Sequence, residues 1–205
     1  MSQAEALSPE KQQQILRGAA EVFALDGYEG ASMSRIAACA GVSKGTLYNY
    51  FDSKADMFAA WVRFECNHML GDVFDGHDPQ GDPEVVLRGL GLYCVRMMVS
   101  VTGRTMYRVA VSEAKKFPEV ARAFYDAGPA IAVARVADWL QQQAALGRLA
   151  ISDPVFAAEQ FFALCQTRLV LRRRLELLSD PTEDEMAAIA DATVAMFLSR
   201  YGERP

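Results

Sequence analysis

Residues 32–54 read SMSRIAACAGVSKGTLYNYFDSK, and this stretch decides the fold. Ser32 and Ser43 each precede a short run with helical spacing of apolar residues, and serine is a preferred cap at a helix start. Gly41 lies between the two runs, where a tight turn needs a positive φ. Ala37 is small enough to let two helices cross closely. The stretch therefore predicts a helix-turn-helix unit, whose second helix can enter the major groove of DNA.

The predicted second helix has one apolar and one polar face. Leu47 and Phe51 lie on the apolar face. The opposite face presents short or flat hydrogen-bonding groups that fit a groove, together with one bare backbone position: Ser43, Lys44, Gly45, Thr46, Tyr48 and Asn49. Residues 31–54 hold three basic residues and one acidic residue, although the whole chain has a net charge of −5. Nucleic-acid affinity needs basic groups at phosphates, so the local charge is the relevant one.

Two alternatives weaken this interpretation without replacing it. The unit could be a packed pair of helices with a glycine between them and no DNA partner. Tyr48 or Tyr50 could each pack against the core instead of facing DNA.

The run Gly41–Lys54 closely resembles the DNA-binding motif of the TetR family of transcriptional regulators, and about 50 N-terminal residues fit, including Phe23, Gly27 and Tyr28. The resemblance implies that the phosphates of double-stranded DNA are contacted by Thr46, Tyr48, Tyr50 and Lys54. It implies that Ser34, Lys44, Gly45 and Asn49 lie closest to the bases, and Arg35 is a further surface cation beside the groove. Many members carry His at the place of Asn49, so its role stays open between base and phosphate.

Helical periodicity dominates the rest of the chain. We expect an all-α fold of about nine helices, in which 9–54 is the DNA-binding domain, 55–205 is a larger ligand-binding and dimerisation domain, and 55–70 is a linking helix. Further helices are expected at 84–102, 104–115, 119–146, 153–178 and 183–201. Gly128-Pro129 should kink or break the helix 119–146. The Gly- and Asp-rich residues 71–83 are the clearest break in the chain.

The segment from Phe117-Pro118 through Gly147-Arg148-Leu149 to Asp153-Pro154 is similar to the C-terminal domain of the AefR-like subgroup. That similarity implies ligand binding and dimerisation by this domain. A small apolar effector would contact an aromatic and methionine-rich set, since flexible thioethers adapt to varied ligands: His68, Tyr93, Met97, Met98, Met106, Tyr107, Phe124, Tyr125 and Trp139. The same residues could instead form an ordinary core.

The helices 153–178 and 183–201 carry apolar residues on more than one face, which is more than one core contact requires. The excess predicts a homodimer interface at Phe161, Phe162, Leu169, Val194 and Phe197. Arg168 and the run Arg172-Arg173-Arg174 suggest either a second nucleic-acid patch or, as we prefer, a face paired with Glu176, Asp184 and Glu185.

Composition excludes several classes of protein. With 51% hydrophobic and 23% charged residues, the 205-residue chain is neither disordered nor collagenous. The widely spaced Cys39, Cys66, Cys94 and Cys165 form no metal motif and indicate a reducing, cytoplasmic setting. We expect no catalytic activity, because neither His68 nor His77 belongs to a catalytic motif. We also expect no cofactor and no membrane segment. The alternatives to a regulator are a helical carrier of small molecules and a helical-bundle enzyme.

Overall fold

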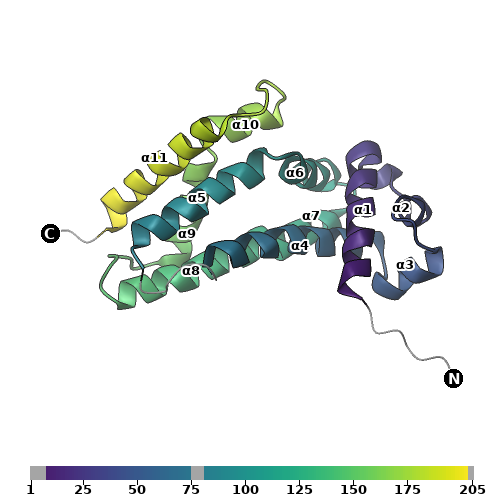
Figure 1. The fold of residues 1–205 in the computed structure, drawn as a ribbon, viewed down its shortest axis with the longest axis horizontal. Coiled ribbons are helices and arrows are strands. Elements are labelled where there is room, and N and C mark those ends of the chain that lie inside the picture. Colours follow the sequence, from purple (N-terminus) through teal and green to yellow (C-terminus); the bar gives the residue numbers. More distant parts are fainter. Residues whose placement is uncertain (1–7, 75–80, 203–205) are drawn as a thin grey trace. The chain divides into compact units, whose positions relative to one another are not determined.

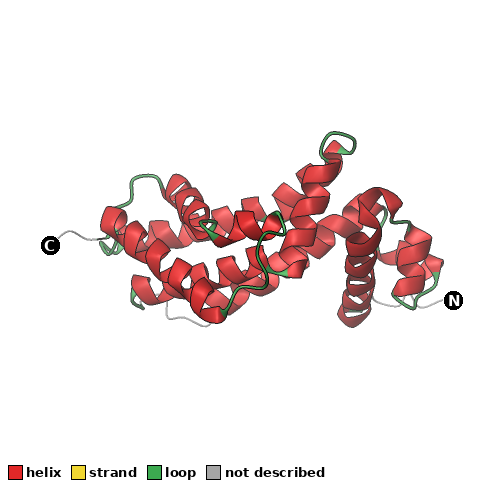
Figure 2. Ribbon diagram, turned by 90° about the horizontal axis from the view of Figure 1, so that it is seen from above, coloured by secondary structure: helices red, strands yellow, loops and turns green. Residues whose placement is uncertain are grey.

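The computed structural model describes residues 8–74 and 81–202 (Figure 1). Every named element of this part is a helix, as Figure 2 shows, so the all-α prediction is confirmed. The helices are α1 (Pro9–Gly30), α2 (Met33–Cys39), α3 (Lys44–Tyr50), α4 (Lys54–Phe74), α5 (Pro83–Val99), α6 (Val101–Glu113), α7 (Pro118–Ala127), α8 (Pro129–Ala145), α9 (Pro154–Cys165), α10 (Leu169–Arg174) and α11 (Glu183–Tyr201).

Eleven helices occur in the described residues, where about nine were expected, because two long helices are divided. Gly128 and Pro129 end α7 and begin α8, so the expected kink is a complete break. The single helix predicted for 153–178 is wrong, since Arg168 adopts a positive φ of 62° between α9 and α10. The expected break at 71–83 starts later, because α4 continues to Phe74; His77 lies outside the described residues.

The chain divides into two compact units, and the division differs from the predicted boundary after residue 54. The first unit combines Met1–Glu65 with Thr105–Gly128, and the second combines Cys66–Arg104 with Pro129–Pro205. Most of α6 and all of α7 therefore fold with the helix-turn-helix segment rather than with the C-terminal helices.

Aromatic rings form the core of the first unit. Phe23 of α1 lies edge-on to Phe58 of α4 and stacks on Trp61, with ring centroids 5.6 and 6.0 Å apart. Tyr28, near the end of α1, contacts Phe117 at 5.6 Å between ring centroids. This contact anchors the segment that precedes α7 on α1.

Two further contacts join the α6–α7 segment to the end of α1. Arg108 of α6 donates a hydrogen bond of 3.2 Å to the carbonyl oxygen of Ala24. Lys116 forms an ion pair with Glu29. The end of α1 is therefore held by residues that follow it by more than 80 positions.

In the second unit, α5 packs along α11 and α8 packs along α9. Phe161 of α9 and Phe197 of α11 are buried and meet edge to face, with ring centroids 5.4 Å apart. Gly91 lets α5 approach α11 closely, because a Cβ atom there would lie 3.4 Å from Cβ of Ala190.

No single helix in the described part of the chain is long and apolar enough to span a membrane; α5 and α6 pass that test only when they are taken together as a bent pair.

Candidate nucleic-acid interface

The α2–turn–α3 geometry follows from its caps. Ser32 Oγ accepts a hydrogen bond from the backbone N–H of Arg35 at 3.2 Å, and Ser43 Oγ accepts one from that of Thr46 at 3.0 Å. Gly41 has a φ of 63°, and the N–H of Val42 donates to the carbonyl oxygen of Ala37 at 3.0 Å. The two helix starts and the turn between them are thus fixed by local hydrogen bonds.

Helix α1 braces this turn through two residues that the sequence analysis did not single out. Gln14 Nε2 donates to the carbonyl oxygen of Ala40 at 2.6 Å. A Cβ atom on Gly18 would lie 2.8 Å from Cβ of Ala40, so only glycine lets α1 and α2 approach this closely. The sequence does carry a signal for Gly18, because a glycine inside an otherwise regular helical pattern often marks close packing.

The outer face of α3 is free for a partner. Lys44, Gly45 and Asn49 are exposed, and the side chain of Tyr48 is 46% exposed, while Leu47 is fully buried beneath them. The side chains of Lys44, Tyr48 and Asn49 form no hydrogen bond or ion pair within the described residues. Ser34 is exposed at the start of α2. The residues expected nearest to the bases are therefore all accessible to a partner.

Other predicted DNA contacts already have partners inside the first unit. Thr46 is half-buried, with its hydroxyl 2.8 Å from that of Ser43. The hydroxyl of Tyr50 accepts a hydrogen bond of 2.9 Å from the N–H of Ser8. Arg35 Nε lies 2.5 Å from a carboxylate oxygen of Asp26.

Lys54, which was predicted to contact a phosphate, binds the end of α1 in the isolated chain. Its ammonium group donates to the carbonyl oxygens of Tyr28 and of Ala31, the latter at 2.8 Å, and lies 4.2 Å from the centroid of the Tyr28 ring. These carbonyl groups lie in the last turn of α1 and directly after it. Burial lowers the pKa of Lys54, while Glu113 and Glu29 oppose that change. Lys54 thus caps α1 in the isolated chain, and its predicted contact with a DNA phosphate stays a prediction.

The predicted effector residues are divided between the two units. Met106, Tyr107, Phe124 and Tyr125 belong to the first, where the rings of Tyr107 and Phe124 meet at 6.5 Å. Four others, Tyr93, Met97, Met98 and Trp139, pack in or against the core of the second. The side chain of His68 lies outside the described residues. The structure does not unite these residues in one described cavity.

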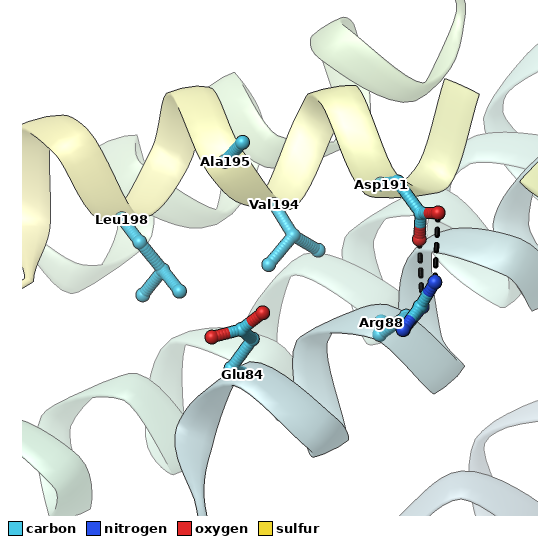
Figure 3. A pocket seen from close by; sticks show the side chains of 6 residues that line it. All are labelled: Glu84, Arg88, Asp191, Val194, Ala195 and Leu198. Carbon is cyan, nitrogen blue, oxygen red and sulfur yellow. Dashed lines mark hydrogen bonds and ion pairs between the residues drawn. The ribbon is translucent and has the colours of Figure 1, made fainter. Parts of the chain in front are cut away.

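A groove of about 450 Å³ runs between α5 and α11, and none of the predicted effector residues lines it (Figure 3). Arg88 and Asp191 close one end with a two-pronged ion pair at 2.6 and 2.7 Å. The carboxylate of Glu84 projects from α5 toward the side of α11 that carries Val194 and Leu198.

The residues predicted as dimer contacts lie in or against the core of the isolated chain. Phe161, Leu169, Val194 and Phe197 are each at most 8% exposed in the isolated chain, and Phe162 is partly buried against the same core. Their side chains already pack within the second unit and leave almost no surface for a partner. The buried apolar residues of α9 and α11 therefore serve this internal core.

The chain matches two family models. One, described as bacterial regulatory proteins of the tetR family, covers residues 15–61, and the other, the AefR-like transcriptional repressor C-terminal domain, covers residues 85–203. Curated relatives include the repressor AcnR of Corynebacterium diphtheriae, 37% identical over 29% of this chain and 31% of that protein. The regulator AcrR of Shigella flexneri is 32% identical over 47% of this chain and 46% of that protein. The chain thus spans less than half of the length of these relatives.

Solved structures match over almost the whole chain. The flavonoid-responsive regulator FrrA is 31% identical with a TM-score of 0.72, and the alignment covers 97% of this chain and all of that one. A TetR-family structure from Mesorhizobium loti is 25% identical with a TM-score of 0.83, and the alignment again covers 97% of this chain and all of that one. Because one family model matches more than half of the chain and the other matches the helix-turn-helix unit, this protein belongs to the TetR family of bacterial regulatory proteins.

Proposed function

We propose that this protein is a cytoplasmic repressor that binds a palindromic operator as a homodimer and is released from it by a small apolar effector. The observation that carries this proposal is the outer face of α3. There Lys44, Tyr48 and Asn49 have no side-chain partner among the described residues, and the helix that carries them is held by its caps and by α1.

Each residue of this face has a role that suits its chemistry. Lys44 and Asn49 offer donors to base edges, and Gly45 allows the backbone to approach them. Ser34 adds a hydroxyl from α2. Tyr48 and Thr46 contact phosphates, which position the helix without reading sequence. Since α3 has only seven residues, one copy reaches few bases, and two copies on a symmetric site supply the affinity.

Dimerisation uses the outer faces of α9 and α11. On α11 the exposed residues at spacings of three or four are mostly small: Ala188, Ala192, Ala195 and Ser199. Met196 beside them is 59% exposed. On α9, Val155 and Phe156 are each 52% exposed, and Glu159 and Ala163 continue that surface. Small residues let helices approach closely, so two copies can bury this apolar surface in a symmetric contact.

Response to an effector is supported by a relative and by composition. The similar protein FrrA is named a flavonoid-responsive regulator. In this chain the partly buried Tyr93, Met97 and Met98 of α5 border the core of the second unit. Flexible thioethers beside an aromatic ring suit an apolar ligand.

The experiment that tests the proposal is selection of bound duplexes from random DNA by the full chain. We expect two inverted half-sites about one helical turn apart, and an affinity that falls steeply with salt. Lys44→Ala and Asn49→Ala should relax sequence preference by about 1 to 3 kcal/mol at the positions they read. Enrichment of no sequence, or of single half-sites alone, would contradict the proposal.

A further inference from the structure

Two arginines of the second unit hold one glutamate between them. Nη1 of Arg104 lies 2.5 Å from Oε1 of Glu176, and Nη1 of Arg173 lies 3.7 Å from Oε2 of the same carboxylate. The arginine side chains are only 14% and 9% exposed, whereas that of Glu176 is 69% exposed. The cations are therefore mostly buried in the protein, and the anion between them faces solvent.

The arginines retain donors that Glu176 does not use. The described hydrogen bonds of Arg104 both leave from Nη1, one to Glu176 and one of 3.4 Å to the carbonyl oxygen of Arg173. Arg173 also donates to the carbonyl oxygen of Leu178 at 3.0 Å and to the carboxylate of Asp180. The Nε atoms of both arginines are buried and have no partner in the described chain. Buried donors without acceptors are rare and need an explanation.

We propose that Arg104 and Arg173 form a binding site for the oxyanion group of a small molecule, a carboxylate or a phosphate, and that Glu176 occupies the site when no ligand is bound. A guanidinium group binds both kinds of oxyanion through paired N–H donors, and its bonds strengthen when water is excluded. A ligand oxyanion would replace the Glu176 carboxylate and also reach the unused Nε donors. Oxyanion binding at this site can be tested in the absence of DNA, so its outcome does not depend on the proposed operator binding.

Other ion pairs of the unit lack this arrangement. Arg96 pairs with Glu183, and Arg88 pairs with Asp191, but these arginine side chains are 49% and 62% exposed. Each involves one guanidinium group at the surface, where such pairs contribute little. Among the ion pairs of the described residues, only this cluster holds two arginines that are mostly buried; Glu176 is shared by both, and the exposed Asp180 pairs with Arg173.

The test uses the full chain with Glu176→Gln and inorganic phosphate as the probe, measured by calorimetry and by melting temperature at constant ionic strength. Removing the competing carboxylate should tighten phosphate binding by about tenfold or more. It should also lower the melting temperature, and phosphate should restore it saturably. An unchanged affinity would overturn the site. If the variant does not fold in chloride, refolding in phosphate supports the site, and failure in both overturns it.

Matched variants separate a site from general charge effects. Glu183→Gln removes an equally exposed glutamate from a single arginine, so phosphate should not rescue it. The double variant Glu176→Gln with Arg104→Gln should no longer bind phosphate. The matched double variant Glu176→Gln with Arg172→Gln should still bind it, because Arg172 is an exposed arginine without a described partner. Equal losses in both double variants would overturn the proposal. The affinity for decanoate is compared with that for phosphate, and decanol serves as the uncharged control for decanoate. The oxyanion that binds more tightly identifies the class of ligand.

Discussion

At the scale of single residues, Gly45 and Gly18 lack a side chain for different reasons. A Cβ atom on Gly45 would meet only Ser43 Oγ, at 3.8 Å, so Gly45→Ala should keep or raise stability, by up to about 1 kcal/mol. It should weaken operator binding by about 1 to 3 kcal/mol, because it blocks the approach to the bases. Gly18→Ala should instead cost about 1 to 3 kcal/mol of stability by overpacking against Ala40. Urea unfolding and operator titration distinguish the two, and a destabilised Gly45→Ala chain would contradict this assignment.

Tyr28 makes the first unit sensitive to alkaline pH. Burial raises the pKa of Tyr28 to about 12, and the charges of Glu119 and Glu113 add to the effect. Tyrosine in the unfolded chain titrates near pH 10. Between about pH 10 and 12 the folded chain keeps a proton that the unfolded chain has lost, so this stability is complete below pH 10 and is lost as pH rises through 12. Urea unfolding of Tyr28→Phe should lack that component; identical pH profiles of the two chains would exclude it.

Individual roles could be predicted from sequence where they depend on neighbours in the chain. The exposed face of α3 follows from helical spacing around Leu47, and the caps at Ser32 and Ser43 follow from local pattern. The role of Lys54 could not be predicted, because its acceptors lie 23 to 26 positions earlier. A motif gives the identity of a residue but not which distant carbonyl groups face it.

At the scale of elements, the end of α1 depends on Lys54. Lys54→Met removes a cation from the carbonyl groups of Tyr28 and Ala31 and should lower the free energy of unfolding by about 1 to 3 kcal/mol. The slope of log affinity against log salt should stay unchanged under folding conditions. A lysine bound to phosphate would instead reduce that slope by about one per contact. A smaller slope with unchanged stability would favour the phosphate role.

Element boundaries were predictable where glycine or proline marks them. Gly41 ends the turn before α3, and Gly128-Pro129 separates α7 from α8. The break between α9 and α10 has no such mark, since Arg168 adopts a positive φ that glycine usually supplies. Packing of α10 against α5 accompanies this conformation, and such tertiary contacts override local propensity.

At the scale of the whole molecule, we predict that the outer strip of α11 forms the dimer. Ala192→Glu places a charge on this strip and should yield folded monomers in sedimentation, with weaker operator binding. Ala134→Glu, at an exposed alanine of α8, should leave the dimer intact. A dimeric Ala192→Glu chain, or dissociation by both variants, would contradict the assignment.

The assembly was the least predictable part of the molecule. Apolar counts correctly indicated that α9 and α11 bury more than one face, but they could not separate an internal core from a partner surface. Phe161 and Phe197 meet each other inside the chain, while the surface proposed for the dimer is formed by exposed alanines that hydropathy barely distinguishes. Which apolar face turns inward depends on neighbouring helices that are distant in sequence.

The docking of α6 and α7 on α1 has a consequence for synthesis on the ribosome. The first unit needs Phe117, Lys116 and Arg108 to complete its contacts with α1. At a translation rate of about 5 to 20 residues per second, the nascent chain waits roughly 3 to 13 s between the emergence of residue 65 and that of residue 128. During that interval Tyr28 lacks its contact with Phe117, and the nascent helix-turn-helix segment offers an apolar surface to chaperones. We expect competence to bind DNA to arise only after more than half of the polypeptide has left the exit tunnel.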